Sequence, residues 1–372
     1  MQILAIFAAL LALIGAAQQL FGARLVERFC AAPTAPPKNR PGITILKPLC
    51  GVDPLTELAL ESFFLLDYPE YQLVFGVHSN TDPVLDILAK LRARYPERDT
   101  ALMVNDSLHG LNRKVSNLIN MRPLAKHEIL LISDADIHVP PYYLDRVASA
   151  LEEPGTGLVT SLYTGLPATQ DLAARLGAAQ INHNFLPGAL LARQLGRQDC
   201  MGATMALTKT VLAQVGGLEA LSDKLADDQV LGRRALAAGY KIALARVFPA
   251  ATVPETDFGA LFRHELRWAR TVRALVTAAY AGSILQMSLI WAGLTVLTAE
   301  AAIWSLLLFL GVLGIRLATA RRVDNALHLP RTGGIWLFLL RDVFSTIIYI
   351  ASFTGNRVDW RGQSMTADSG RA

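Results

Sequence analysis

Residues 127–139 read HEILLISDADIHV, and the fold can be inferred outward from this stretch. Residues 129–133 form a short apolar run that ends in a serine, which predicts a buried β-strand. The run stops at Asp134 and Asp136, which are separated by one alanine. Side chains alternate along an extended chain, so these two carboxylates point the same way. Such a pair can hold a divalent cation, although an ordinary acidic turn is the alternative reading.

The composition indicates a soluble domain joined to a few membrane helices. The 372 residues are 52% hydrophobic, which is too apolar for an ordinary soluble enzyme, yet 18% charged, which is too polar for a pure membrane bundle. The net charge of +4 comes without a run of Lys and Arg interleaved with aromatics. This pattern argues against nucleic acid as a partner and fits anionic lipid headgroups. The three cysteines are far apart, which argues against a disulfide framework and suits a reducing compartment.

The N-terminus predicts a membrane anchor. Residues 1–21 are almost wholly apolar and just long enough to cross a bilayer, and they lack the basic start of a signal peptide. Residues 22–41 are a basic, proline-rich linker. Its positive charges place the following domain in the cytoplasm, so we expect a multi-pass protein of the inner (cytoplasmic) membrane.

Residues 42–257 alternate between short β-rich runs and helical stretches. Strands are predicted at 43–46, 72–77, 101–104, 129–133, 158–162 and 241–247, and helices at 54–66, 82–95, 113–119, 170–191, 211–215 and 230–238. This alternation predicts an α/β domain with a mostly parallel, Rossmann-like sheet covered by helices on both faces. Ligands of such sheets bind at the carboxyl ends of the strands, where Asp134 and Asp136 are expected. The small residues of 200–207, CMGATMAL, suit a wall where a ligand approaches the backbone.

The remaining chain predicts an interface helix, membrane helices and a tail. Residues 258–280 are amphipathic with four arginines on one side, which suits either a solvated face or a helix in the membrane interface. Residues 283–354 hold the C-terminal membrane helices: a hairpin of two spans turns near Glu300, and 335–353 follows. Arg341 and Asp342 interrupt this last segment, so it is either a span with a buried ion pair or a re-entrant or interfacial helix. Residues 355–372 form a polar tail.

Several motifs occur together in a characteristic order. They are LKPL at 46–49, GVDP at 51–54, LDYP at 66–69, TDP at 81–83, KVSNL at 114–118, ISD at 132–134, ADD at 226–228 and RW at 267–268. With the membrane helices, this set resembles the inverting glycosyltransferases of family 2 build, and specifically the ceramide glucosyltransferases. The short anchor and the HELRWAR helix at 264–270 are most similar to the bacterial hopanoid biosynthesis-associated glycosyltransferases. The resemblance runs from about residue 43 to the last apolar segment and implies a GT-A-type fold.

The resemblance also implies an activity and a donor site. The activity is transfer of a sugar from a UDP-sugar to a lipid hydroxyl with Mg²⁺ or Mn²⁺, most closely N-acetylglucosamine to a hopanoid polyol, with glucose to ceramide second. Asp134 and Asp136 are assigned to the metal, and Asp134 also to the nucleotide-sugar. Asp82 is assigned to the uracil or ribose and Lys114 to the nucleotide or a phosphate. Judged as residues alone, Asp82 also suits a helix N-cap and Lys114 an ordinary surface lysine.

The same resemblance assigns the catalytic residues. Asp228 is the expected base for the acceptor hydroxyl, with Asp227 as its neighbour, and Arg267 suits the diphosphate through its planar fork of donors. Trp268 is expected at the acceptor or at headgroup level, and His183 near the donor or acceptor pocket, although a lone histidine is more often structural. Two positions depart from the pattern. His264 stands where Gln or Arg is usual, and Asp136 stands where ceramide glucosyltransferases usually have a small residue.

Two rival functions are weaker. A polysaccharide synthase needs more membrane helices to form a channel than the three or four predicted here. A non-enzymatic membrane scaffold with a degenerate transferase domain need not keep all five of Asp82, Asp134, Asp136, Asp228 and Arg267. No nucleophile is placed for a two-step route, so direct displacement with inversion is expected.

Overall fold

The computed structural model describes residues 1–331, 333–360 and 363–367, which form two compact units. The sheet unit consists of Pro33–Ala168 and Gly196–Pro254. The membrane-helix unit consists of Met1–Ala32, Thr169–Leu195 and Glu255–Ala372. The sequence assigned 42–257 to one domain, whereas in the structure Thr169–Leu195 groups with the membrane helices.

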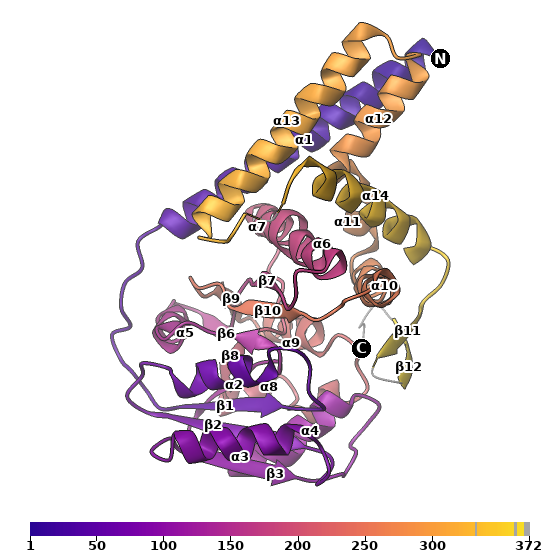
Figure 1. Ribbon diagram of the computed structural model, residues 1–372. Coiled ribbons are helices and arrows are strands. Elements are labelled where there is room, and N and C mark those ends of the chain that lie inside the picture. Colours follow the sequence, from indigo (N-terminus) through magenta and orange to yellow (C-terminus); the bar gives the residue numbers. More distant parts are fainter. Residues whose placement is uncertain (332, 361–362, 368–372) are drawn as a thin grey trace. The chain divides into compact units, whose positions relative to one another are not determined.

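The sheet unit is built on a seven-stranded sheet (Figure 1). Its order is β3-β2-β1-β4-β8-β6-β9. The strands are β1 Ile43–Pro48, β2 Tyr71–Val77, β3 Thr100–Val104, β4 Ile129–Ile132, β6 Thr156–Thr160, β8 Met205–Thr208 and β9 Lys241–Leu244. Only β8 runs antiparallel to its neighbours, β4 and β6, and the other neighbouring pairs are parallel. The predicted mostly parallel sheet is therefore confirmed.

Helices cover both faces of this sheet. They are α2 Thr56–Phe64, α3 Val84–Arg94, α4 Arg113–Met121, α5 Tyr143–Leu151, α8 Lys209–Gln214 and α9 Asp227–Ala237. Strand β4 shows the alternation that builds two cores, because Leu131 packs in the cluster with Phe63 while Leu130 packs in the cluster with Leu118. A strand buried on both faces reads as one apolar run, which explains the sequence of β4.

A second, three-stranded sheet anchors the acidic turn after β4. Its order is β5-β10-β7, with β5 Ile137–His138, β10 Ala250–Val253 and β7 Thr164–Pro167. Strand β5 follows Asp136 directly, and the Thr252 amide donates to the Asp136 carbonyl at 3.0 Å. The acidic turn is therefore tied at one end to the large sheet and at the other to the small one.

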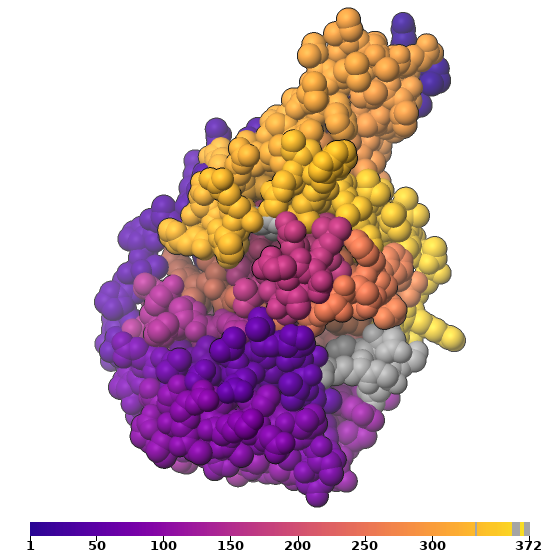
Figure 2. Space-filling view, in the orientation of Figure 1, coloured from indigo at the N-terminus to yellow at the C-terminus, as the bar shows by residue number. Residues whose placement is uncertain are grey.

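The membrane-helix unit contains three helices long and apolar enough to cross a bilayer, counted over the described residues. These are α1 Gln2–Ala31, α13 Ile303–Ala326 and α14 Ile335–Ser352. Helix α1 ends ten positions beyond the predicted anchor, and α12 Ser288–Thr298 and α13 pack along it (Figure 1). Figure 2 shows the orange side chains of these two helices covering much of the indigo α1.

The predicted hairpin of two spans differs from the structure in its first arm. The turn lies where expected, at Glu300 and Ala301, which both take left-handed backbone angles. Helix α12, however, has only 11 residues, or about 17 Å, which is too short for a bilayer core of about 30 Å. It reaches spanning length only if Thr277–Gln286, from which it is bent by 60°, is counted with it.

The two charged residues of α14 do not pair with each other. The Arg341 guanidinium donates to both carboxylate oxygens of Glu265 on α10 Phe258–Leu275, each at 2.7 Å. Asp342 instead lies 3.2 Å from Arg316 on α13. Of the two options for this segment, the one with a buried Arg341–Asp342 pair therefore differs from the structure in its partners, because each charge pairs with a neighbouring helix.

The C-terminal residues add order that the polar tail did not predict. Strands β11 Arg357–Trp360 and β12 Gln363–Thr366 form an antiparallel pair. Arg270 donates to the Arg357 carbonyl at 2.6 Å, and Arg273 donates to the Gly355 carbonyl at 2.9 Å. Two of the four arginines of α10 are thus used to hold the C-terminal segment.

Candidate active site

The candidate site lies at the carboxyl edge of the sheet unit, where β1, β2 and β4 end side by side. The chain leaves β1 toward β2 on one side, while β4 lies on the other. Such a reversal opens a crevice at the ends of the strands, where ligands of α/β sheets bind. Asp134 follows β4 after one residue, Ser133, and Asp82 follows β2 by a short loop.

Asp82 organises the loops after β1 and β2. Its carboxylate accepts the Gly51 amide at 2.9 and 3.1 Å and the Val84 amide at 3.0 Å. The contact with Val84 satisfies the first amide of α3, although Asp82 lies one position before the N-cap, which is Pro83. The contact with Gly51 fixes the loop after β1, where this glycine takes a positive φ of 71°. The nucleotide contact assigned to Asp82 remains a prediction.

Lys114 lies at the centre of an acidic cluster. Its Nζ is 2.7 Å from Asp134 Oδ1 and 3.1 Å from Asp227 Oδ2. Burial by itself would lower the pKa of Lys114, but these two carboxylates outweigh burial and raise its pKa above the ordinary value. Lys114 is therefore a charged group held in place and not the ordinary surface lysine that was its alternative reading.

The start of α4 positions this lysine. The Asn112 side chain accepts the Val115 amide at 3.1 Å, which is an N-cap bond, and donates to the Lys224 carbonyl at 2.8 Å. The second bond ties the start of α4 to the loop that leads into α9. Lys114 and Asp227 are therefore fixed relative to each other through one asparagine.

Gly202 marks the point on which the predicted residues converge. A Cβ at this glycine would lie 3.1 Å from Asp134 Oδ2, 3.5 Å from Asp228 Oδ2 and 3.7 Å from Lys114 Nζ. The glycine loop is held on both sides, because Gln229 donates to the Cys200 carbonyl at 2.6 Å and the Met201 amide donates to Thr160 at 2.8 Å. Asp134 and Asp228, which are 94 positions apart in the chain, thus face one point beside bare backbone.

Asp227 and Asp228 have different surroundings in the first turn of α9. Asp227 is buried and paired with Lys114. Asp228 is half-buried, and its Oδ1 accepts the Gln229 amide at 2.7 Å. Burial, followed by the negative charge of Asp227, raises the pKa of Asp228 to about 7. A carboxyl group with a pKa near neutrality is suited to take a proton, which favours Asp228 over Asp227 as the base.

Lys47 is a site residue that the sequence analysis missed. It is fully buried, its Nζ donates to the Asp134 carbonyl, and it lies 3.9 Å from the ring centroid of Phe63. Burial lowers the pKa of Lys47 to about 7, although the negative charges of Asp136 and Asp134 act in the opposite direction and raise it. The available signal was a lysine inside the apolar strand ITILKP, because a charge at a buried strand position needs a nearby partner.

The carboxylates of Asp134 and Asp136 can bind a metal ion only if a bound ligand supplies further oxygen atoms. Over the described residues there is no group of three or more His, Cys, Asp and Glu side chains that could hold a metal by itself. Asp134 is about one-third exposed, and with Asp136 it offers a pair of carboxylates at the edge of the sheet. Mg²⁺ typically binds one or two carboxylates plus phosphate oxygens of a substrate, so this donor set fits a nucleotide-bound cation.

The other predicted residues belong to the membrane-helix unit. His183 is buried in the π-helical turn Ile181–Phe185 between α6 Leu172–Gln180 and α7 Leu186–Gln194, with Nε2 2.7 Å from Asp324 Oδ1. Trp268 lies on α10 one turn after His264, and their ring centroids are 4.3 Å apart. Arg267 precedes Trp268 on the same helix. The catalytic roles assigned to His183, Arg267 and Trp268 remain predictions.

The sheet and its acidic edge define the class of protein as a GT-A-type glycosyltransferase fold. A mannosyltransferase from Pyrobaculum calidifontis, solved in complex with GDP-mannose and Mn²⁺, has a TM-score of 0.55 to this chain, with 19% identity. The likeness covers 94% of this chain and 99% of that one. At this level of identity it shows the fold alone.

The chain belongs to glycosyl transferase family 21, whose family model matches residues 4–372. Ceramide glucosyltransferase 1 of Caenorhabditis elegans is 26% identical over 216 residues, which cover 56% of this chain and 45% of that protein. Ceramide glucosyltransferase of Komagataella phaffii is 34% identical over 132 residues, which cover 34% of this chain and 26% of that protein. The chain thus spans less than half the length of the curated relatives that it matches.

Proposed function

We propose that this protein is a membrane-bound inverting glycosyltransferase that moves a sugar from a UDP-sugar to a hydroxyl group of a membrane lipid. The observation that carries the proposal is the convergence of Asp134, Asp228 and Lys114 on one point beside Gly202. A transferase of this kind needs a place for a diphosphate and a base within reach of the reacting carbon. The cluster offers both at the edge of the sheet where nucleotides bind.

The donor would lie along the carboxyl ends of β1, β2 and β4. Asp82 would contact the uracil or ribose, and Lys114, held charged between two carboxylates, would face the diphosphate. Asp134 and Asp136 would hold Mg²⁺ or Mn²⁺, which when bound stabilises the charge of the diphosphate as a Lewis acid. Gly202 leaves room for the donor because it adds no side chain at the centre of the cluster.

Asp228 would act on the acceptor. Its carboxylate takes the proton of the lipid hydroxyl as that oxygen bonds to the anomeric carbon, while the bond from this carbon to the diphosphate breaks and UDP leaves. Attack from the face opposite the leaving group inverts the configuration. By the resemblance, Arg267 would bind the diphosphate and Trp268 would lie at the acceptor or at headgroup level. By the same resemblance, His183 would lie near the donor or the acceptor pocket.

Two pairs of sugar and lipid acceptor have support. The named relatives are ceramide glucosyltransferases, which supports glucose and ceramide as sugar and acceptor. The HELRWAR helix supports N-acetylglucosamine and a hopanoid polyol. The basic residues that flank the apolar helices support an inner-membrane protein with its sheet unit in the cytoplasm.

Lipid mass spectrometry of the host, with and without the gene, tests the acceptor. Loss of a hexosamine-bearing hopanoid supports N-acetylglucosamine and a hopanoid polyol, and loss of a glucosylceramide supports glucose and ceramide. An unchanged lipid profile, combined with no transfer by the purified protein to either lipid, contradicts the proposed function.

Purified variants test the roles of the acids. Asp228→Asn should abolish transfer and leave UDP binding nearly unchanged, whereas Asp134→Ala should weaken the part of UDP binding that depends on Mn²⁺ or Mg²⁺. Calorimetric titration with UDP, with and without the cation, measures both effects. Loss of UDP binding in Asp228→Asn contradicts its role as base, and UDP binding that ignores the cation contradicts the metal.

A further inference from the structure

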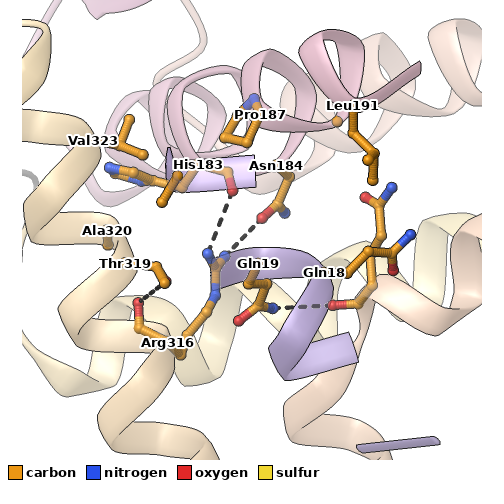
Figure 3. A pocket seen from close by; sticks show the side chains of 13 residues that line it. Gln18, Gln19, His183, Asn184, Pro187, Leu191, Arg316, Thr319, Ala320 and Val323 are labelled. Atoms are coloured by element: carbon orange, nitrogen blue, oxygen red, sulfur yellow. Dashed lines mark hydrogen bonds between the residues drawn. The ribbon is translucent and has the colours of Figure 1, made fainter. Parts of the chain in front are cut away.

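A polar pocket lies inside the membrane-helix unit (Figure 3). It is formed by α1, the turn and helix around His183 and Pro187, α13, and the short turn Ser283–Gln286. The cavity volume is about 30 Å³. This space can take a hydroxyl group or a water molecule, so the bulk of any ligand would stay at the mouth of the pocket.

The pocket is unusual because amide side chains line it between helices that are otherwise apolar. Gln18 and Gln19 of α1, Asn184 and Gln286 all contribute to its wall. Residues 3–17 of α1 carry no polar side chain, and Arg24, Glu27 and Arg28 follow the two glutamines. On α13, Arg321 and Arg322 likewise follow the lining residue Ala320. The pocket therefore lies where these helices change from apolar to charged, which corresponds to headgroup depth in a bilayer.

Arg316, which lines the wall, brings little net charge into the pocket. Arg316 is 1% exposed and lies 3.2 Å from the Asp342 carboxylate, and it also donates to the Asn184 side chain at 2.7 Å. A buried ion pair is close to neutral when seen from outside. The pocket therefore exerts little electrostatic attraction on a phosphate or another anion.

The hydrogen bonds leave a specific set of groups without partners. Gln19 Nε2 donates to the Gln286 carbonyl at 3.1 Å, and because a carbonyl can only accept, this bond fixes which end of the amide is nitrogen. Gln19 Oε1 is then a buried acceptor without a donor among the described residues, as is Gln18 Oε1. Arg316 Nε is a buried donor without an acceptor in the same part of the chain.

A hydroxyl group matches this set, because it can donate to an amide oxygen and accept from an N–H group. A fully ionised phosphate can only accept, so it would leave the Gln19 oxygen without a donor. We propose that the pocket binds the hydroxyl-bearing headgroup of a neutral membrane lipid. The lipid is either the acceptor of sugar transfer, in which case the assignment rests on the proposed function, or a resident lipid that is not turned over.

Lipid retention by the purified full-length protein in nanodiscs tests the proposal without any sugar donor. The probes are a ceramide, a hopanoid polyol, a ceramide with methylated hydroxyls and phosphatidic acid, and native mass spectrometry counts the retained lipid. Gln18→Leu and Gln19→Leu should each reduce retention of a hydroxyl-bearing probe by about tenfold, the usual effect of losing one buried hydrogen bond. Gln2→Leu is the matched control, because Gln2 lies on the same helix, is exposed and does not line the pocket.

Leucine suits a membrane helix, and unchanged UDP binding would confirm that each variant is folded. If the KM for the lipid acceptor rises by a similar factor, the bound lipid is the acceptor. If retention falls while KM is unchanged, it is a resident lipid. Retention that is equal in wild type and both variants, or a preference for phosphatidic acid or the methylated ceramide, overturns the proposal. A wild type that retains lipid but transfers no sugar contradicts the proposed function and leaves the pocket assignment standing.

Discussion

At the scale of single residues, neighbouring aspartates show how surroundings divide chemical roles. Asp227 is buried and lies 3.1 Å from the Lys114 ammonium. Asp228 is next in the chain, and both burial and the negative charge of Asp227 raise its pKa. One position of the backbone therefore separates an acid that holds a lysine from an acid that can take up a proton near pH 7.

This division predicts a pH effect of Asp227→Asn. A base works only when it is deprotonated, so transfer by the wild type should rise with pH through the raised pKa of Asp228, which is about 7. The negative charge of Asp227 is one of the causes that raise the pKa of Asp228. Its removal should therefore move the acidic limb of the kcat/KM profile to lower pH by roughly one unit. Asp86→Asn, which changes an exposed carboxylate on α3, is the control and should leave the limb in place. An unmoved or raised limb in Asp227→Asn would count against Asp228 as the base.

Motif order predicted much of the candidate site, and packing supplied the rest. Asp134, Asp228 and Lys114 were chosen from the sequence, and the structure brings them together in the sheet unit. Lys47 was not chosen, and Gly202 was covered only as part of the wall predicted at 200–207, because their partners depend on which strands and loops come together in three dimensions. A lysine in a buried strand and a glycine in an apolar run are signals, but neither identifies its partners.

At the scale of elements, α10 is fastened to α14 by a buried ion pair. Glu265 is 7% exposed and Arg341 is fully buried, and their two hydrogen bonds are joined by a third from Arg341 to the Leu176 carbonyl at 3.1 Å. Glu265 lies two positions before Arg267 in the chain, so the pair also fixes the rotation of the helix that carries the predicted diphosphate ligand.

Breaking this pair on one side should cost more than removing it altogether. Arg341→Met leaves the Glu265 carboxylate buried without its partner and should destabilise the protein by about 3–5 kcal/mol, whereas Arg341→Met with Glu265→Leu should recover most of that loss. Thermal unfolding in detergent micelles measures both variants. Arg321→Met, at an exposed position of α13, is the matched control and should have little effect. Additive losses in the double variant would show that the two side chains are not coupled.

The elements themselves were predictable in proportion to their length and periodicity. The long strands of the large sheet lie within a few residues of their predicted bounds. Strands β5, β7 and β10 were missed because they have two to four residues each and depend on one another for pairing. Helix α5 was also missed, although its buried residues recur at helical spacing. In α12 and α13 the apolar composition was informative, but the 60° bend before α12 left no clear signal.

At the scale of the whole molecule, the chain passes between the two units four times. The passages fall after Ala32, Ala168, Leu195 and Pro254. The inserted segment Thr169–Leu195 leaves after β7 and returns shortly before β8, which is the antiparallel strand of the large sheet. Sequence composition could not reveal this arrangement, because α6 and α7 are not apolar enough to stand out from the helices around the sheet.

Deleting residues 1–32 tests how the protein is held in the membrane. The remaining chain keeps α13 and α14, each long and apolar enough to cross a bilayer, so it should stay in the pellet after alkaline carbonate extraction. The full-length protein and a soluble marker protein serve as the two reference fractions. Recovery of the shortened protein in the supernatant would mean that α1 is the essential anchor.

The excursion of Thr169–Leu195 has a practical consequence for anyone who wishes to work with the sheet unit in solution. Because this unit is made from two separate stretches, no single proteolytic cut can shed it, and trimming the chain from either end cannot isolate it. To produce the sheet unit by itself, Thr169–Leu195 must be removed and Ala168 joined to Gly196 by a linker. For the same reason, the exchange of one uninterrupted gene segment cannot graft this unit onto a different anchor.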